Sequence, residues 1–180
     1  MRKNLWIVAL LLLAHTTTSY SQLTVGDTPT RALATDGSFI SWKEHIIDDR
    51  LTSGVPFNGS DGLEMADLDR DGIDDIVSVH ESDSTYDSTA PGETPPAMGH
   101  VRIAFGSNNP YDWTNITLAE GADASAAEDA AIADVNGDGF LDIMVAAELS
   151  HLIYFQNPGQ DIRNRTWERL ILPMTQGRGS

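Results

Sequence analysis

The chain has 180 residues, no cysteine, and 27 acidic against 11 basic residues, for a formal net charge of −16. A protein surface with this net negative charge repels nucleic acid and anionic lipid, so neither is expected as a partner. Disulfide cross-links are excluded, and bound metal is the expected cross-link of an exported domain.

The N-terminus predicts a cleaved secretory signal peptide over residues 1–21. Arg2 and Lys3 precede an apolar run from Leu5 to Ala14, and a small polar stretch follows as far as Ser21. The apolar run is too short to span a bilayer. We therefore expect a secreted protein, extracellular or periplasmic, with no integral membrane segment after cleavage. Residues 22–39 are expected to form an N-terminal linker.

A first acidic loop occupies residues 67–75, with an oxygen-bearing side chain at positions 1, 3, 5 and 9. Calcium takes about six to eight oxygen ligands, and a tightly curled loop can supply them from alternate positions. The predicted ligands are Asp67, Asp69, Asp71, Asp75 and the backbone carbonyl of Ile73.

A second loop, residues 134–142, repeats the pattern. The predicted ligands are Asp134, Asn136, Asp138, Asp142 and the backbone carbonyl of Phe140. Asp, Asn and Gly also mark ordinary polar turns, which is the structural alternative for either loop alone. Two loops that match at every ligand position favour bound Ca²⁺ over that alternative.

Two further features define the kind of calcium loop. Gly72 and Gly139 stand at position 6, where a sharp bend requires a residue without a side chain. An EF-hand needs a glutamate at position 12, but that position holds Ser78 and Val145. Position 12 therefore argues against an EF-hand.

Short apolar, partly β-branched runs flank both loops, at 63–66 and 76–79 and again at 130–133 and 143–145. Runs of this length predict β-strands, so each loop is expected to connect two strands. The predicted fold class is all-β.

An internal repeat organises the rest of the chain. Trp42 and Trp113 precede the two loops at similar distances, and a third copy begins at Trp167. The matched tryptophans are expected to pack between sheets. The copies differ by a polar segment rich in Ser, Thr, Asp, Pro and Gly, 82–99, which predicts an exposed insertion that either binds a partner or is merely tolerated.

The two Asp-x-Asp/Asn-x-Asp-Gly-x-x-Asp loops, their flanking strands and the segment 154–159 (Tyr-Phe-Gln-Asn-Pro-Gly) resemble the FG-GAP/VCBS repeat family, whose blades also occur in integrin α subunits. The resemblance implies β-propeller blades with structural calcium. We expect two complete four-stranded blades, about 40–106 and 112–158, with each loop between the second and third strands. Residues 166–173 are expected to start a third blade.

A closed propeller usually has about four to eight blades, so two blades and part of a third predict an open fragment. Further blades or a partner chain would be needed to close the ring.

Catalytic groups are sparse. There is no cysteine, no serine in a nucleophile-elbow context and no His-Glu-x-x-His motif. His80 and Glu81, with His45 elsewhere, are candidates for an acid–base or second metal site. His100 and His151 stand at equivalent repeat positions, as do Glu81 and Glu148, which favours structural roles for the histidines. An enzyme is the less favoured interpretation.

The sequence thus predicts a secreted calcium-binding β-propeller repeat module for ligand binding or adhesion, with a protein or glycan ligand that it does not identify. The alternative is part of a secreted carbohydrate-active lyase or dehydratase built on a propeller scaffold.

Overall fold

The computed structural model describes residues 28–82, 98–147 and 152–172. The predicted signal peptide, most of the 82–99 insertion, and Glu148 and His151 lie outside these residues, so the predictions made for them stay predictions. None of the helices in the described residues is long and apolar enough to cross a membrane.

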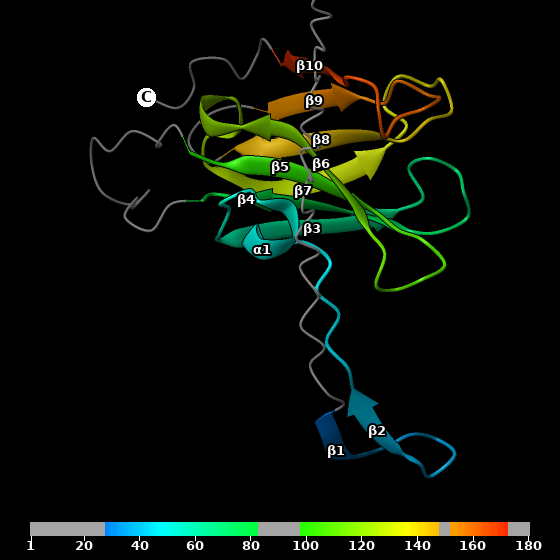
Figure 1. The fold of residues 1–180 in the computed structure, drawn as a ribbon. Helices are drawn as coiled ribbons and strands as arrows, with labels where there is room; N and C mark the ends of the chain where they lie inside the picture. Colours follow the sequence, from blue (N-terminus) through cyan, green and yellow to red (C-terminus); the bar gives the residue numbers. More distant parts are fainter. Residues whose placement is uncertain (1–27, 83–97, 148–151, 173–180) are drawn as a thin grey trace, which may run out of the picture.

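The first sheet contains four antiparallel strands in the order β3-β4-β5-β6 (Figure 1). These strands are β3 (Ser60–Ala66), β4 (Asp75–His80), β5 (His100–Phe105) and β6 (Thr114–Glu120). The acidic loop 67–75 connects β3 to β4. The alternation along β4 assigns the two faces of this sheet: Val77 and Val79 are fully buried, whereas Ile76 and Ser78, which alternate with them, point to the other face.

The second sheet has the same plan, in the order β7-β8-β9-β10. Its strands are β7 (Ala127–Ala133), β8 (Asp142–Ala147), β9 (Leu152–Gln156) and β10 (Glu168–Ile171), and a 3₁₀ turn, η1 (Gly121–Ala124), precedes β7. Loop 134–142 connects β7 to β8, so the two acidic loops occupy equivalent positions in the two sheets.

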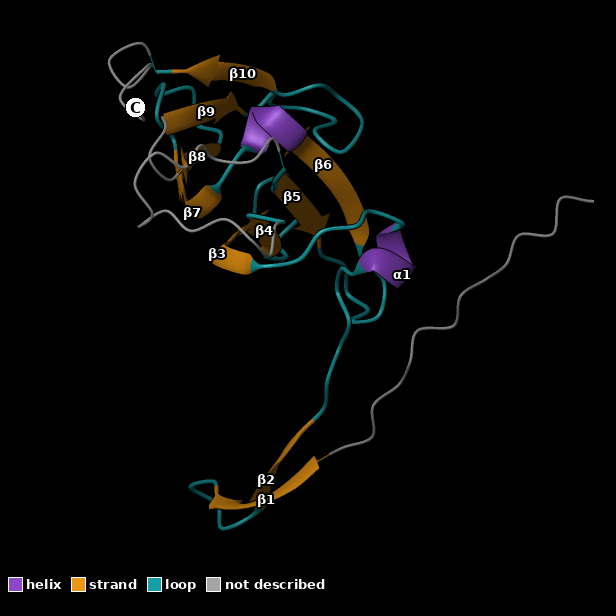
Figure 2. Cartoon of the chain, turned by 90° about the vertical axis from the view of Figure 1, so that its left-hand side faces the viewer, coloured by secondary structure: helices purple, strands orange, loops and turns teal. Residues whose placement is uncertain are grey.

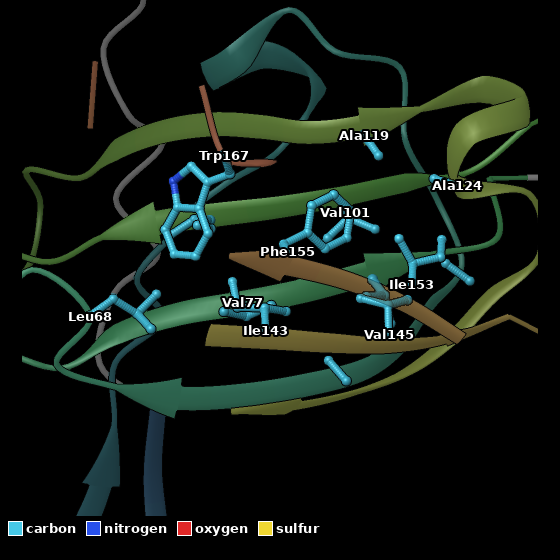
Figure 3. Close-up of a cluster of buried hydrophobic side chains, with 14 of the residues drawn as sticks. Leu68, Val77, Val101, Ala119, Ala124, Ile143, Val145, Ile153, Phe155 and Trp167 are labelled. Carbon is cyan, nitrogen blue, oxygen red and sulfur yellow. The ribbon is translucent and has the colours of Figure 1, made fainter. Parts of the chain in front are cut away.

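One hydrophobic core lies between the two sheets (Figure 3). The first sheet contributes Val77, Val101, Ile103 and Phe105, and the second contributes Ile143, Val145, Ile153 and Phe155. β-Branched and aromatic residues suit this position because their side chains pack well on a pleated surface. Leu68, Ile162 and Trp167 extend the core at the side of the acidic loops.

The two sheets approach each other most closely where β3 packs against β7. A Cβ atom at Gly62 would lie 2.7 Å from Cα of Asp129, so only glycine fits at this point of β3. This contact sets how the sheets stack.

The N-terminal part of the described chain lies partly apart from the sheets. β1 (Thr28–Leu33) and β2 (Phe39–Trp42) form a two-stranded antiparallel hairpin, and Figures 1 and 2 show this hairpin at the end of an extended arm. β1 lies in the region predicted as a linker, 22–39, whereas most of β2 lies in the range predicted for the first blade, about 40–106. The segment that follows, residues 43–59 with the short α1 (Arg50–Ser53), returns to the first sheet. There Asn115 Nδ2 donates a hydrogen bond to the carbonyl of Ile47 at 2.9 Å.

The predicted all-β class is confirmed, since two four-stranded antiparallel sheets and one small sheet account for the strands in the described residues. Their stacking is open and consistent with two neighbouring propeller blades.

The strand boundaries of the predicted blades differ from the observed sheets. The strand after Trp113 is the fourth strand of the first sheet, because β6 pairs with β5. The strand after Trp167 likewise does not start a third blade, because β10 pairs with β9. Each tryptophan strand therefore closes the preceding sheet, and each acidic loop lies between the first and second strands of its sheet, not the second and third.

The expected common role of the tryptophans is wrong for one of the three. Trp167 is 5 % exposed in the core, as predicted, and Trp113 is half-buried. Trp42 belongs to the separate hairpin and is 68 % exposed. The reason is that Trp42 lies in β2, which within the described residues pairs with β1 alone and packs against neither four-stranded sheet.

Candidate metal centre

The first acidic loop brings together three of its predicted ligands. One carboxylate oxygen from each of Asp67, Asp69 and Asp71 lies within 4.8 Å of the others. Backbone amides hold the side chains in place: Asp67 accepts hydrogen bonds from the N–H of Asp71 and of Gly72, both at 3.0 Å. The bend predicted at position 6 is confirmed, since Gly72 has φ +89°.

The ninth residue of this loop, Asp75, lies beneath it and is fully buried. Its Oδ2 accepts from the N–H of Leu68 at 2.9 Å, and its Oδ1 accepts from the N–H of Gly106 at 2.9 Å. Burial raises the pKa of this carboxyl to about 6, although both backbone amides act in the opposite direction. Asp75 therefore joins the loop to the end of β5, and its role as a ligand stays a prediction.

The second loop repeats this backbone arrangement with one carboxylate fewer. Asp134 accepts from the N–H of Gly137 at 2.8 Å and of Gly139 at 2.9 Å, and Gly139 has φ +89°. The amide of Asn136 donates to Asp138 at 2.9 Å. A hydrogen bond from the N–H of Phe140, together with the one from Asn136, lowers the pKa of Asp138. The second loop is therefore rich in oxygen ligands like the first loop, but it carries a smaller negative charge.

Asp142, at position 9 of the second loop, is buried like Asp75. It accepts from the N–H of Val135 at 3.1 Å, from the N–H of Asn157 at 2.8 Å and from the hydroxyl of Tyr154 at 3.0 Å. The same carboxylate thus fixes the loop, the end of β9 and a tyrosine on β9.

The two loops are adjacent and share side chains. Asn157 donates from Nδ2 to the carbonyl of Leu68 in the first loop at 3.2 Å, and to the carbonyl of Leu141 in the second at 2.9 Å. The guanidinium of Arg70 lies 4.1 Å from the centre of the Phe140 ring. The candidate metal centre is therefore a pair of loops at one end of the two sheets.

An arginine from the second sheet contacts the acidic cluster of the first loop. Arg163, in the turn between β9 and β10, donates to Asp69 Oδ2 at 2.7 Å and to Asp71 Oδ2 at 3.1 Å. The guanidinium also lies 4.9 Å from the centre of the Phe105 ring. One positive charge therefore offsets part of the repulsion among the carboxylates.

The donor set fits a hard divalent cation. Carboxylate oxygens on a curled loop are the ligands that calcium prefers, and the cluster contains neither sulfur nor imidazole. The carbonyls of Ile73 and Phe140 and the carboxylates of Asp75 and Asp142 stay predicted ligands. The sequence analysis missed Arg163, Asn157 and the contact of Arg70 with the second loop, since no spacing rule predicts contacts between positions so far apart in the chain.

His80 and His100 lie elsewhere, on the first sheet, whereas His45 lies in segment 43–59, with its ring centre 4.7 Å from that of Tyr111. His80 is 5 % exposed, with Nε2 hydrogen-bonded to Ser78 Oγ at 3.0 Å and its ring centre 4.5 Å from that of Phe57. His100 is buried, and its Nδ1 lies 2.7 Å from Ser82 Oγ. Burial lowers the pKa of both histidines, that of His80 to about 4. These contacts agree with the structural role predicted for His100.

The shifted pKa of His80 predicts an acid-sensitive fold. Between pH 6.5 and about 4 the unfolded chain protonates this imidazole while the folded chain does not, so stability falls as pH falls through this window. Asp75 acts in the opposite direction, because its raised pKa lets the folded state bind a proton first. The informative quantity is therefore the difference between His80→Gln and wild type, measured by urea unfolding in chelator.

In that comparison the Asp75 contribution is common to both proteins and cancels. Acidification from pH 6.5 to 4 should cost the wild type about 2–3 kcal/mol more than the variant. Equal losses in the two proteins would show that His80 is not held neutral by the fold.

The fold and the loops define a class: repeated antiparallel sheets, each with an Asp-rich loop between its first two strands. Residues 126–160 match the FG-GAP repeat family, which confirms the predicted resemblance over β7, β8, β9 and the second acidic loop. No curated protein and no solved structure matches the chain.

Proposed function

We propose that this protein is a secreted binding or adhesion module whose repeated sheets are stabilised by Ca²⁺ in the two acidic loops. The observation that carries the proposal is the convergence of Asp67, Asp69 and Asp71 in a loop that recurs in the second sheet. The FG-GAP repeat over residues 126–160 supports it. The ligand is a protein or a glycan, and further blades or a partner chain complete the propeller.

Calcium has a clear physical route to stability in this arrangement. The acidic residues of the first loop are held close together, and a divalent ion removes their mutual repulsion. Asp75 and Asp142 then connect each loop to the end of a core strand through buried hydrogen bonds. An ion that binds only the folded loop shifts the folding equilibrium by mass action.

Calcium titration of the full chain tests this proposal. At a free calcium concentration of 100 times Kd, one site should add about 2.7 kcal/mol to stability. The melting temperature should rise by several degrees and return after chelation, and calorimetry should show calcium uptake. The double variant Asp67→Asn, Asp71→Asn should lose most of this shift.

Asp112→Asn is the matched control, because Asp112 is an exposed carboxylate outside both loops. This variant should keep the full calcium response. Absence of calcium uptake by the wild type, or a melting temperature indifferent to chelator, would refute the proposal.

The lyase or dehydratase alternative rests on His80 and Glu81, and no contact of His80 among the described residues favours it. Turnover of polysaccharides or oxidised sugars, lost in His80→Ala or Glu81→Ala, would support that alternative.

A further inference from the structure

A pocket of about 300 Å³ lies on the face of the first sheet that is turned away from the core. Segment 43–59 forms one wall and the sheet forms the other. Phe57 and Ile47 line it from the segment, and Leu63, Ile76 and Ala104 line it from the sheet. The acidic loops are not part of its lining, so this pocket is separate from the candidate metal centre.

Two polar side chains in the pocket lining are incompletely bonded. Asp48 Oδ1 and His80 Nδ1 are buried and have no hydrogen-bond partner within the part of the chain that the structure describes. His80 is 5 % exposed, and the side chain of Asp48 is 10 % exposed. Buried polar atoms in native proteins nearly always have a partner, so these two atoms have hydrogen-bonding capacity left for a ligand group or a water.

The charges at the base of this pocket are already matched. Arg102, 2 % exposed, donates from Nε to Asp48 Oδ2 at 2.5 Å and from Nη1 to Thr117 Oγ1. A ligand carboxylate or phosphate would meet the Asp48 carboxylate, and a ligand ammonium would be a second buried cation beside Arg102. Either charge would be costly to bury. The pocket therefore suits a neutral ligand.

The neutral ligand must donate hydrogen bonds and also present an apolar surface. Asp48 accepts only, Ser78 and Ser60 offer hydroxyls, and Asn58 offers an amide, while Phe57 supplies an aromatic wall. A sugar ring has hydroxyl donors around its edge and C–H groups on its faces. The pocket volume stands at the lower limit for ligand sites, about 300–1,000 Å³, and suits one such ring.

We propose that this pocket binds a single neutral pyranose unit, either free or at the end of a glycan. The inference names a ligand class and a site for the binding module proposed above, and rests on that function. The sugar hydroxyls donate to Asp48 and Ser78, and the C–H face of the ring packs on Phe57 and Leu63. Calcium is not a ligand of the sugar in this pocket.

The test is calorimetric titration of the full chain with methyl pyranosides of glucose, galactose and mannose, and with oligosaccharides that end in them. Butylammonium and acetate are the charged probes. Leu63→Trp fills the pocket from an exposed position, and Leu170→Trp is the matched control on β10, since these leucines are 58 % and 50 % exposed. Melting temperatures with calcium and with chelator are recorded for the same samples.

We expect at least one pyranoside to bind wild type and Leu170→Trp, and to bind Leu63→Trp at least tenfold more weakly. If a methyl pyranoside binds, a single free sugar ring is sufficient for binding. If only the oligosaccharides bind, the ligand of the pocket is the end of a glycan. No pyranoside binding, equal binding by Leu63→Trp, or preference for a charged probe overturns the inference. So does a change of oligomeric state in Leu63→Trp without sugar binding, which would assign the pocket to a second copy of the chain.

The two proposals fail separately. A calcium-independent melting temperature would refute calcium stabilisation and leave the pyranose result standing. A calcium-dependent melting temperature without sugar binding would refute the pocket inference alone.

Discussion

Replacing Asp142 by alanine should destabilise the fold by about 3–5 kcal/mol, because one buried and two partly buried donors then lose their acceptor at about 1–3 kcal/mol each, less any partial relaxation. The donors are the N–H groups of Val135 and Asn157 and the hydroxyl of Tyr154. Equilibrium urea unfolding in the presence of chelator measures the loss without a contribution from bound ions. Asp142→Asn keeps one acceptor oxygen and should lie between wild type and Asp142→Ala.

Asp138→Ala is the control within the same loop. Asp138 is exposed, so its removal in chelator should cost about 1 kcal/mol or less. Losses of similar size in Asp138→Ala and Asp142→Ala would show that the position-9 carboxylate has no special structural role. The equivalent pair in the first loop, Asp71 and Asp75, provides a second comparison.

Arg163→Gln should weaken the calcium-free protein and strengthen its binding of calcium. In the absence of an ion the guanidinium is the positive charge nearest Asp69 and Asp71 among their described contacts, at 2.7 and 3.1 Å. Its removal restores repulsion among the carboxylates, with an expected cost of about 1 kcal/mol for this partly exposed group. A calcium ion then no longer binds against a resident cation, and its affinity should rise about threefold to tenfold.

Calorimetric titration gives the affinity, and thermal unfolding with and without chelator gives the stability change. Arg165→Gln is the matched control: Arg165 lies in the same turn, and its guanidinium donates to the carbonyl of Pro158, which lies outside both acidic loops. Unchanged or weaker calcium binding by Arg163→Gln would show that Arg163 organises the carboxylates and does not compete with the ion.

The local features of the candidate metal centre could be predicted from sequence. Asp67, Asp69 and Asp71 converge because they lie on one short curled segment, where alternate side chains share a side and Gly72 permits the bend. The short β-branched runs likewise determine that their segments are strands. These conclusions need only neighbours in the chain.

Long-range partners could not be predicted from the same patterns. β10 pairs with β9, and Trp167 beside it packs in the core. The hydrophobic periodicity of the sequence does not show this packing. The predicted blade boundaries therefore differ from the observed sheets by one strand. Arg163 and Asp69 are far apart in sequence and meet because the sheets stack. The buried roles of Asp75 and Asp142 also depend on the ends of β5 and β9.

The bridging amide of Asn157 has a consequence for how the protein responds to ions. Its two hydrogen atoms hold a carbonyl from each acidic loop, so the backbone of one loop cannot move without stretching a bond that also positions the other. The loops are thereby thermodynamically linked, and the linkage is reciprocal. Whatever rigidifies either loop reduces the entropy cost of ordering its neighbour.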